Sequence, residues 1–138
     1  MLLSTSEDIA LKAMIYISAN SGKSRCSINE IARNEAVPRE YLAKILKRLV
    51  QRNLLSSKRG VFGGYQLIKN RGDISFLDII EAIDGDFRAM VKHDQKLKIA
   101  NGNHPASEFW SEMHKQISEK LSKMTLDKID YKKFYPDS

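Results

Sequence analysis

The sequence has a single cysteine, Cys26, among its 138 residues. A lone cysteine excludes an internal disulfide framework and fits a reducing compartment. The sequence also lacks any uninterrupted apolar run of about 18 residues, which a membrane-spanning helix would need. Its start has no cationic segment followed by an apolar one, the pattern of a signal peptide. We therefore expect a soluble cytoplasmic protein with no membrane partner.

Sequence motifs of the common enzyme classes are absent as well. The chain contains no P-loop, no dinucleotide-binding fingerprint and no serine, histidine and aspartate in the order of a hydrolase triad. Its three histidines, His93, His104 and His114, do not have the spacing of a dense metal motif. We therefore predict no catalysis, no metal and no cofactor. A histidine site completed by Asp94 or Glu108 is the alternative.

Positive charge is in excess, and one segment concentrates it. Lys and Arg number 23 against 17 Asp and Glu, a formal net charge of +6, which favours a polyanionic partner without identifying one. Residues 38–52 hold five basic side chains and one acidic one. Their apolar side chains recur at helical spacing, at Leu42, Ile45, Leu46 and Leu49. We expect an amphipathic helix whose basic face either binds phosphates or is simply solvated.

Two helix start signals precede this basic helix. A serine followed three residues later by a glutamate occurs at 4–7 and at 27–30, the spacing of a capping box. These signals predict helices over about 5–20 and 28–35. The second of them meets the basic helix across a tight turn, with Pro38 in the first turn of the basic helix. Two helices joined in this way are typical of a helix-turn-helix.

A hairpin is predicted directly after the basic helix. Residues 54–58 and 65–69 have the pattern of two short strands around the glycine-rich loop 59–64. Ser75 is expected to cap another helix that ends near Ile83. The predicted fold class is mainly α, a winged helix-turn-helix with a two-stranded wing and a long C-terminal dimerisation helix.

The long helix is predicted over 105–124, where apolar residues step by three or four positions. Such a stripe is a core face, a cofactor pocket or a dimer seam, and we expect a dimer seam. Five residues are expected to form it: Phe109, Trp110, Met113, Ile117 and Leu121. The chain then divides into a DNA-binding domain at 1–85, a polar connector at 86–104, and the dimerisation helix and tail at 105–138.

The sequence RGVFGGYQL, directly behind a helix-turn-helix, is the most specific signal in the chain. The chain resembles the bacterial winged-helix repressors that include IscR, NsrR and CymR. The matching positions extend over nearly the whole chain: Ala13 and Met14, Ile28 to Ile31, Tyr41 and Leu42, 59–65, Asp78 to Asp84, Trp110, and Thr125 with Leu126. The resemblance implies a homodimeric transcription regulator, a repressor, on a pseudo-palindromic promoter site in double-stranded DNA. Two-fold symmetry would set its recognition helices about 34 Å apart.

Groove chemistry then assigns roles along the basic helix. Four residues near its start lie off the apolar stripe and are expected to face base edges in the major groove: Arg39, Glu40, Ala43 and Lys44. Lys47 and Arg48 are expected to bind phosphates, which set orientation and salt dependence. Tyr41 is expected to be mostly buried, either beneath the wing or with its hydroxyl on a phosphate.

The wing is the second predicted contact with DNA. Gly60, Gly63 and Gly64 are expected to take positive φ and to let the backbone lie close to the sugar-phosphate surface. The resemblance places Arg59 in the minor groove, with Lys58 beside it on the DNA. The alternative is that Arg59 is an exposed turn residue and the glycines only form the turn.

The chain departs from the cluster-binding relatives at three positions. Where those relatives place cysteines before the long helix, this chain has Lys92, Lys98 and His104. An iron-sulfur cluster needs several thiolates, so we predict none. The connector joins the DNA-binding unit to the dimer helix, and we expect a small-molecule or protein effector to act there.

Cys26 precedes the second helix, close to Lys23 and Arg25. The helix dipole and these cations would lower the pKa of the thiol, which motivates the hypothesis of a thiol switch. We favour the other interpretation, a small apolar filler at the base of the helix-turn-helix. For the whole protein, the rival functions are a protein-interaction module that keeps the fold but binds DNA weakly and without sequence preference, and a general nucleic-acid-packaging protein.

Overall fold

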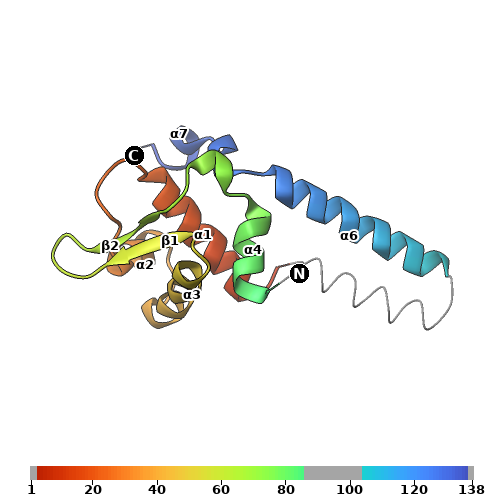
Figure 1. Cartoon of the computed structure of the whole chain (residues 1–138), viewed down its shortest axis with the longest axis horizontal. Coiled ribbons are helices and arrows are strands. Elements are labelled where there is room, and N and C mark those ends of the chain that lie inside the picture. Colours follow the sequence, from red (N-terminus) through yellow and green to blue (C-terminus); the bar gives the residue numbers. More distant parts are fainter. Residues whose placement is uncertain (1–2, 86–103, 137–138) are drawn as a thin grey trace.

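The computed structural model describes residues 3–85 and 104–136, and within them the chain is mainly helical with one two-stranded antiparallel sheet (Figure 1). This is the predicted fold class. The elements follow one another along the chain as α1 (Thr5–Ala19), α2 (Ile28–Asn34), α3 (Arg39–Gln51), β1 (Leu55–Lys58), β2 (Gly64–Leu67), the 3-10 helix η1 (Arg71–Asp73), α4 (Phe76–Asp84), α6 (Pro105–Lys123), the 3-10 helix η2 (Leu126–Lys128) and α7 (Tyr131–Phe134).

Side-chain caps set where three of the helices begin. The Ser4 hydroxyl accepts the backbone N–H of Glu7 at 3.2 Å and opens α1. Complete capping boxes open two others, formed by Ser27 with Glu30 in α2 and by Ser75 with Asp78 in α4. Pro38 differs from its prediction, because it is the N-cap residue of α3 rather than a residue of its first turn. Its extended ψ of 129° turns the chain from α2 into α3.

The core lies where α1, α3 and α4 pack together. Met14 of α1, Leu46 of α3 and Ile79 of α4 are fully buried. The predicted apolar stripe of α3 lies inside this core, at Leu42, Ile45, Leu46 and Leu49. Burial of each such side chain stabilises the fold by roughly 1.5–3 kcal/mol relative to exposure. The same packing orients the opposite, charged face of α3 toward solvent.

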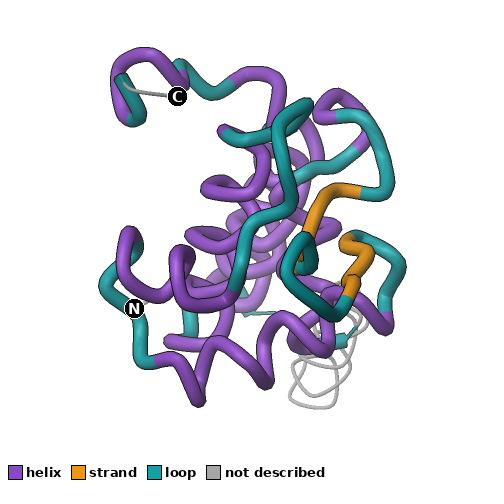
Figure 2. Tube along the Cα trace, turned by 90° about the vertical axis from the view of Figure 1, so that its left-hand side faces the viewer, coloured by secondary structure: helices purple, strands orange, loops and turns teal. Residues whose placement is uncertain are grey.

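The hairpin is attached to the helix-turn-helix by backbone hydrogen bonds. β1 pairs with β2 from Leu55 opposite Leu67 to Lys58 opposite Gly64. The strand β2 is also bonded on its other side, where Cys26 and Tyr65 exchange two N–H···O bonds of 2.9 and 2.8 Å. Figure 2, seen from the hairpin end of the molecule, shows the two strands in front of the helices. We call β1, β2 and the loop between them the wing.

Helix α6 extends away from the body of the molecule, and the end that begins at Pro105 is the more distant one (Figure 1). Its other end is joined to the body, because the N–H of Phe76 donates to the carbonyl of Met124 at 2.8 Å and the N–H of Leu126 to that of Ile74 at 3.0 Å. Leu126 is fully buried in the core. The residues after α6 therefore pack on the winged-helix body.

Most of the predicted connector, including Lys92 and Lys98, lies outside the described residues. The division at 1–85, 86–104 and 105–138 and the effector role of the connector therefore stay predictions. Among the helices that the structure describes, none is both long and apolar enough to cross a membrane.

Candidate nucleic-acid interface

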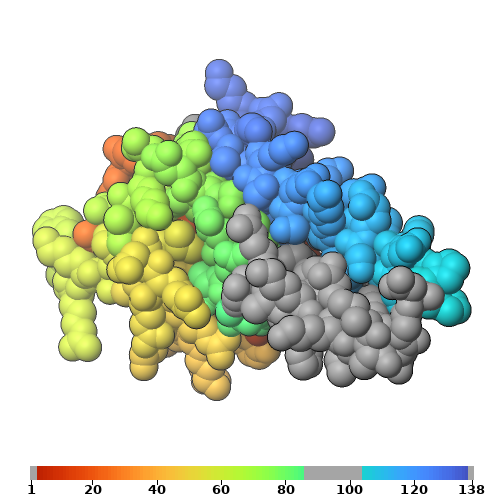
Figure 3. Space-filling model, turned by 45° about the vertical axis from the view of Figure 1, so that its right-hand side comes forward, coloured from red at the N-terminus to blue at the C-terminus, as the bar shows by residue number. Residues whose placement is uncertain are grey.

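A groove of about 860 Å³ lies between α3 and the wing. Four basic side chains line it, and none of its described lining residues is acidic. The four are Arg39, Lys47, Lys58 and Arg59. Figure 3 shows side chains of α3 and of the wing projecting from one side of the molecule. We call this feature the α3–wing groove, and its charge suits a polyanion.

Helical spacing places the α3 residues of the groove on one face. Arg39, Ala43 and Lys47 are four residues apart, so they lie above one another along the helix. Arg39 is also held from α2, because its Nε donates to Oδ1 of Asn29 at 2.8 Å. This bond positions the guanidinium across the helix-turn-helix. Sequence reasoning missed Asn29, whose partner lies ten residues away on the next helix.

The wing glycines serve different purposes. Gly60 and Gly64 have φ of 107° and 127°, as predicted for them. The prediction is wrong for Gly63, which is not among the residues with positive φ. A Cβ at Gly63 would lie 2.2 Å from the carbonyl oxygen of Lys58, so the closed loop leaves no room for a side chain. A Cβ at Gly64 would lie 2.5 Å from the carbonyl oxygen of Cys26, where β2 meets the segment before α2.

Arg25 fixes the wing relative to the helices. Its Nη1 donates to the carbonyl and to the hydroxyl of Ser56 on β1, each at 3.1 Å, and to the carbonyl of Gly64 on β2 at 3.4 Å. One guanidinium thus joins both strands to the segment that precedes α2. The sequence carries no signal for this contact, because its partners lie 31 and 39 residues along the chain.

Cys26 does not have the predicted electropositive setting. Its side chain is buried, and Arg25 is engaged with the wing. Burial raises the pKa of the Cys26 thiol to about 12, and the negative charge of Glu30 adds to the increase. The hypothesis of a lowered pKa is therefore wrong, and the thiol is protonated at neutral pH. Its burial and its place in the core agree with the favoured interpretation, an apolar filler.

Four predicted DNA-contacting residues of α3 lie outside the lining of the α3–wing groove: Glu40, Tyr41, Lys44 and Arg48. Glu40 and Lys44 are exposed, so their expected contacts with base edges stay predictions. Tyr41 is 45% exposed, and the prediction that it is mostly buried is wrong. The apolar stripe of α3 fills the core without it. Arg48 donates from Nη1 to the carbonyl of Ile83 at 3.0 Å, which ties α3 to the end of α4.

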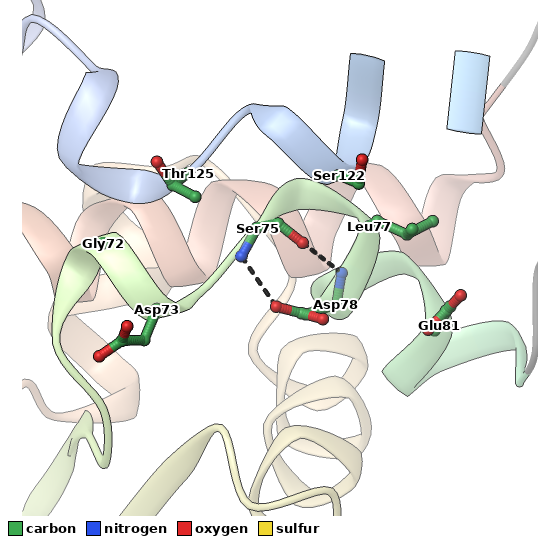
Figure 4. Close-up of a pocket in the computed structure, with 8 residues that line it drawn as sticks. All are labelled: Gly72, Asp73, Ser75, Leu77, Asp78, Glu81, Ser122 and Thr125. Atoms are coloured by element: carbon green, nitrogen blue, oxygen red, sulfur yellow. Dashed lines mark hydrogen bonds between the residues drawn. The ribbon is translucent and has the colours of Figure 1, made fainter. Parts of the chain in front are cut away.

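A second hollow, of about 630 Å³, lies where η1, α4 and α6 come together (Figure 4). Asp73, Asp78 and Glu81 line it, so its charge is opposite to that of the α3–wing groove. The dashed lines in Figure 4 are the reciprocal bonds of Ser75 and Asp78 that cap α4. Repulsion makes this acidic hollow unsuited to nucleic acid.

The predicted dimer stripe of α6 is partly exposed in the single chain. Phe109 and Trp110 are 58% and 52% exposed, with their ring centroids 5.4 Å apart. Met113, Ile117 and Leu121 are half-buried, and no described residue of α6 is fully buried. Two large aromatic side chains thus stand on the part of α6 farthest from the body.

Comparison with known proteins identifies the family. Residues 3–130 match the Rrf2 family, which is described as "Iron-dependent Transcriptional regulator". The chain belongs to the Rrf2 family. The match covers the winged helix-turn-helix and α6, and it confirms the resemblance seen in the sequence. This Rrf2 chain is a transcriptional regulator with the DNA-binding winged-helix fold of the family.

Named relatives of this Rrf2 regulator agree over most of its length. The transcriptional regulator IscR of Sodalis glossinidius is 28% identical over 94% of this chain and 78% of its own. The solved structure of CymR, the global cysteine regulator of B. subtilis, has a TM-score of 0.79 and 26% identity, covering 92% of this chain and 94% of that one. The structure of IscR from T. potens has a TM-score of 0.76 and 26% identity over 92% and 84% of the two chains.

The donor atoms of this Rrf2 chain do not fit an iron-sulfur cluster. Its single cysteine is buried beneath the wing and cannot supply several thiolates. His104 caps α6, with Nδ1 accepting the N–H of Ala106 at 3.1 Å. Within the described part of the chain, no group of three His, Cys, Asp or Glu side chains is placed to hold a metal ion. His93 and Asp94, two members of the alternative histidine site, lie outside that part.

Proposed function

We propose that this Rrf2 regulator acts as a homodimeric repressor, which binds a pseudo-palindromic promoter site in double-stranded DNA without an iron-sulfur cluster. The α3–wing groove carries the proposal, because two separate elements contribute four cations to one hollow with no described acidic lining residue. DNA offers a matching surface of regularly spaced phosphates. The function therefore rests on binding and not on catalysis.

The α3–wing groove can receive one sugar-phosphate strand of a DNA duplex. With α3 in a major groove and the tip of the wing in the adjacent minor groove, the sugar-phosphate strand between them lies in the α3–wing groove. Lys47 and Lys58, on opposite sides of that groove, then neutralise phosphates. Arg39, held by Asn29 at the start of α3, faces base edges. Arg59 enters the minor groove, where a narrow A·T segment concentrates negative potential.

Helix α6 supports a dimer. Its two exposed aromatic residues and the half-buried aliphatic residues that follow them form the kind of apolar surface that a second copy covers, and a two-fold axis makes the same patch meet itself. Two copies joined in this way present two copies of α3. A spacing of about 34 Å between them matches one turn of DNA and requires an inverted repeat in the site.

The test is selection of genomic DNA fragments by the purified protein, followed by sequencing. We expect retained fragments to share an inverted repeat whose half-sites are about one helical turn apart, upstream of genes. Transcription in vitro from such a promoter should fall when the protein is added. Retention of fragments with no common motif would favour a packaging protein. Weak retention that vanishes at physiological salt would favour a protein-interaction module.

A further inference from the structure

The tip of the wing is a tight turn with two apolar residues at its centre. The N–H of Gly63 donates to the carbonyl of Gly60 at 3.0 Å, which closes a four-residue turn around Val61 and Phe62. Val61 is 95% exposed and Phe62 is 88% exposed. Neither belongs to the described hydrophobic core or to the partly buried residues packed against it.

Turn chemistry does not account for this pair. Central turn positions favour glycine, proline, asparagine, aspartate and serine, each for a conformational or hydrogen-bonding reason. The shape of this turn comes from its flanks, where Gly60 has positive φ and Gly63 has no room for a Cβ. An exposed phenylalanine at a central turn position departs from these preferences and does not add to the packing of the core. Departures of this kind are expected at functional sites.

The surroundings of the tip indicate what Phe62 meets. Lys58 and Arg59 directly precede the turn, and both line the α3–wing groove together with Val61. Arg25 holds the base of the wing through both strands. The apolar tip therefore extends from a basic and firmly positioned hairpin that borders the α3–wing groove, so the polyanion that occupies this groove also meets the tip.

We propose that Phe62 is an apolar wedge that enters the minor groove beside Arg59 and partly opens one base step of the bound duplex. The proposal rests on the proposed function, since it needs the wing to lie on DNA. Apolar side chains inserted from the minor groove unstack a step and bend the duplex toward the major groove. A flat aromatic ring suits such insertion better than the branched side chain of Val61.

The wedge gives the protein a way to read sequence without hydrogen bonds to bases. Pyrimidine–purine steps such as TA and CA/TG unstack easily, whereas A-tracts are stiff. A site with a flexible step under the wing therefore binds more tightly than one with a stiff step. The protein thereby selects the DNA sequence at the flank of its site, because the free energy of deforming the duplex there depends on that sequence.

The experiment uses the full-length protein and a duplex recovered by genomic selection, with fluorophores at its two ends to report bending by energy transfer. A second set of duplexes carries either a TA step or a stiff A-tract at the position under the wing. The variants are Phe62→Ala, Phe62→Leu, which keeps an apolar wedge, and Phe134→Ala as the matched control at an exposed phenylalanine on α7. Circular dichroism checks that each variant folds.

We expect the wild type to bend the duplex and to prefer the TA step by about tenfold, the scale of one unfavourable base step. Phe62→Ala should lose the bend and the preference, while Phe62→Leu keeps most of both and Phe134→Ala leaves both unchanged. Wild-type bending and preference in Phe62→Ala would overturn the wedge while leaving the proposed function intact. Changed self-association of Phe62→Ala in sedimentation, with unchanged DNA behaviour, would overturn it in favour of a protein contact. Failure of the wild type to bind any selected duplex would instead contradict the proposed function.

Discussion

Arg48 of α3 donates from Nη1 to the backbone carbonyl of Ile83 at 3.0 Å. The acceptor belongs to the last turn of α4, where carbonyls have no partner within the helix and a positive charge is favourable. The bond therefore links α3, which lines the α3–wing groove, to α4, which packs beside it in the core. Arg48 and Lys47 are neighbours in sequence, yet only Lys47 is among the described lining residues of the groove.

Arg48→Ala should therefore act mainly on stability. Loss of the bond to Ile83 leaves a carbonyl without its partner, and we expect the free energy of unfolding to fall by about 1 kcal/mol. The salt dependence of DNA binding should stay close to that of the wild type. Urea denaturation measures the first effect, and binding titrations at several salt concentrations measure the second. A stable variant with a clearly shallower salt dependence would show that Arg48 binds a phosphate after all.

Lys47→Ala should affect DNA binding and leave the stability of the fold nearly unchanged. The side chain is exposed at the groove, so its removal should leave the stability nearly unchanged. Loss of one phosphate contact should weaken binding to all DNA sequences alike and lower the slope of log K against log salt by about 1. Fluorescence anisotropy on a selected duplex and on random DNA provides the measurement. Lys44→Ala is the control on the same helix, and it should relax sequence preference if Lys44 reads bases. Equal losses for both variants on both DNAs would count against direct readout.

Glu7 makes the stability of the fold depend on pH. Burial raises the pKa of Glu7 from 4.5 to about 7, with a further increase from its hydrogen bond to Asp84 and the charge of that residue. Between these two pH values the folded chain holds a proton that the unfolded chain releases. The free energy of unfolding contributed by Glu7 therefore falls as the pH rises from about 4.5 to about 7 and is constant above that range.

Glu7→Gln tests this directly, because the amide resembles the protonated acid. We expect the variant and the wild type to be similarly stable near pH 4.5, and the variant to be the more stable one above pH 7. Urea denaturation of both proteins across this range gives the difference curve, which reports the titration of Glu7 together with that of its partner Asp84. A difference that does not change with pH would contradict the prediction.

Trp110→Ala should weaken self-association. The indole is 52% exposed in the single chain, and a dimer seam along α6 would cover it in both copies. We expect the dissociation constant of the dimer to rise at least tenfold, as is typical of a buried aromatic anchor. Sedimentation velocity over a range of protein concentrations gives this constant. Phe134→Ala is a matched control, because Phe134 is 63% exposed but lies on α7. Equal effects of the two substitutions would argue against a seam on α6.

Local sequence rules predicted the elements of this fold well. The serine and glutamate at 27–30 became a complete capping box, and the apolar stripe of α3 is buried as its period indicates. The hairpin around the glycine-rich loop forms within one or two residues of its predicted ends. Each of these features depends on residues three or four positions apart, or on backbone conformations that glycine alone adopts easily. Such information is present in any short stretch of the chain.

The roles of individual polar residues were decided by the tertiary structure. Arg25, one of the two cations in the thiol-switch hypothesis for Cys26, instead holds both strands of the wing, and Cys26 lies buried with a raised pKa. The sequence alone could therefore determine a winged helix-turn-helix with a basic helix and a wing that carries an arginine. The packing of the elements determined which cations line the groove, because a guanidinium donates to the hydrogen-bond acceptors that folding brings close to it. For Arg25 and Arg48 those acceptors lie more than thirty residues away, beyond any local pattern.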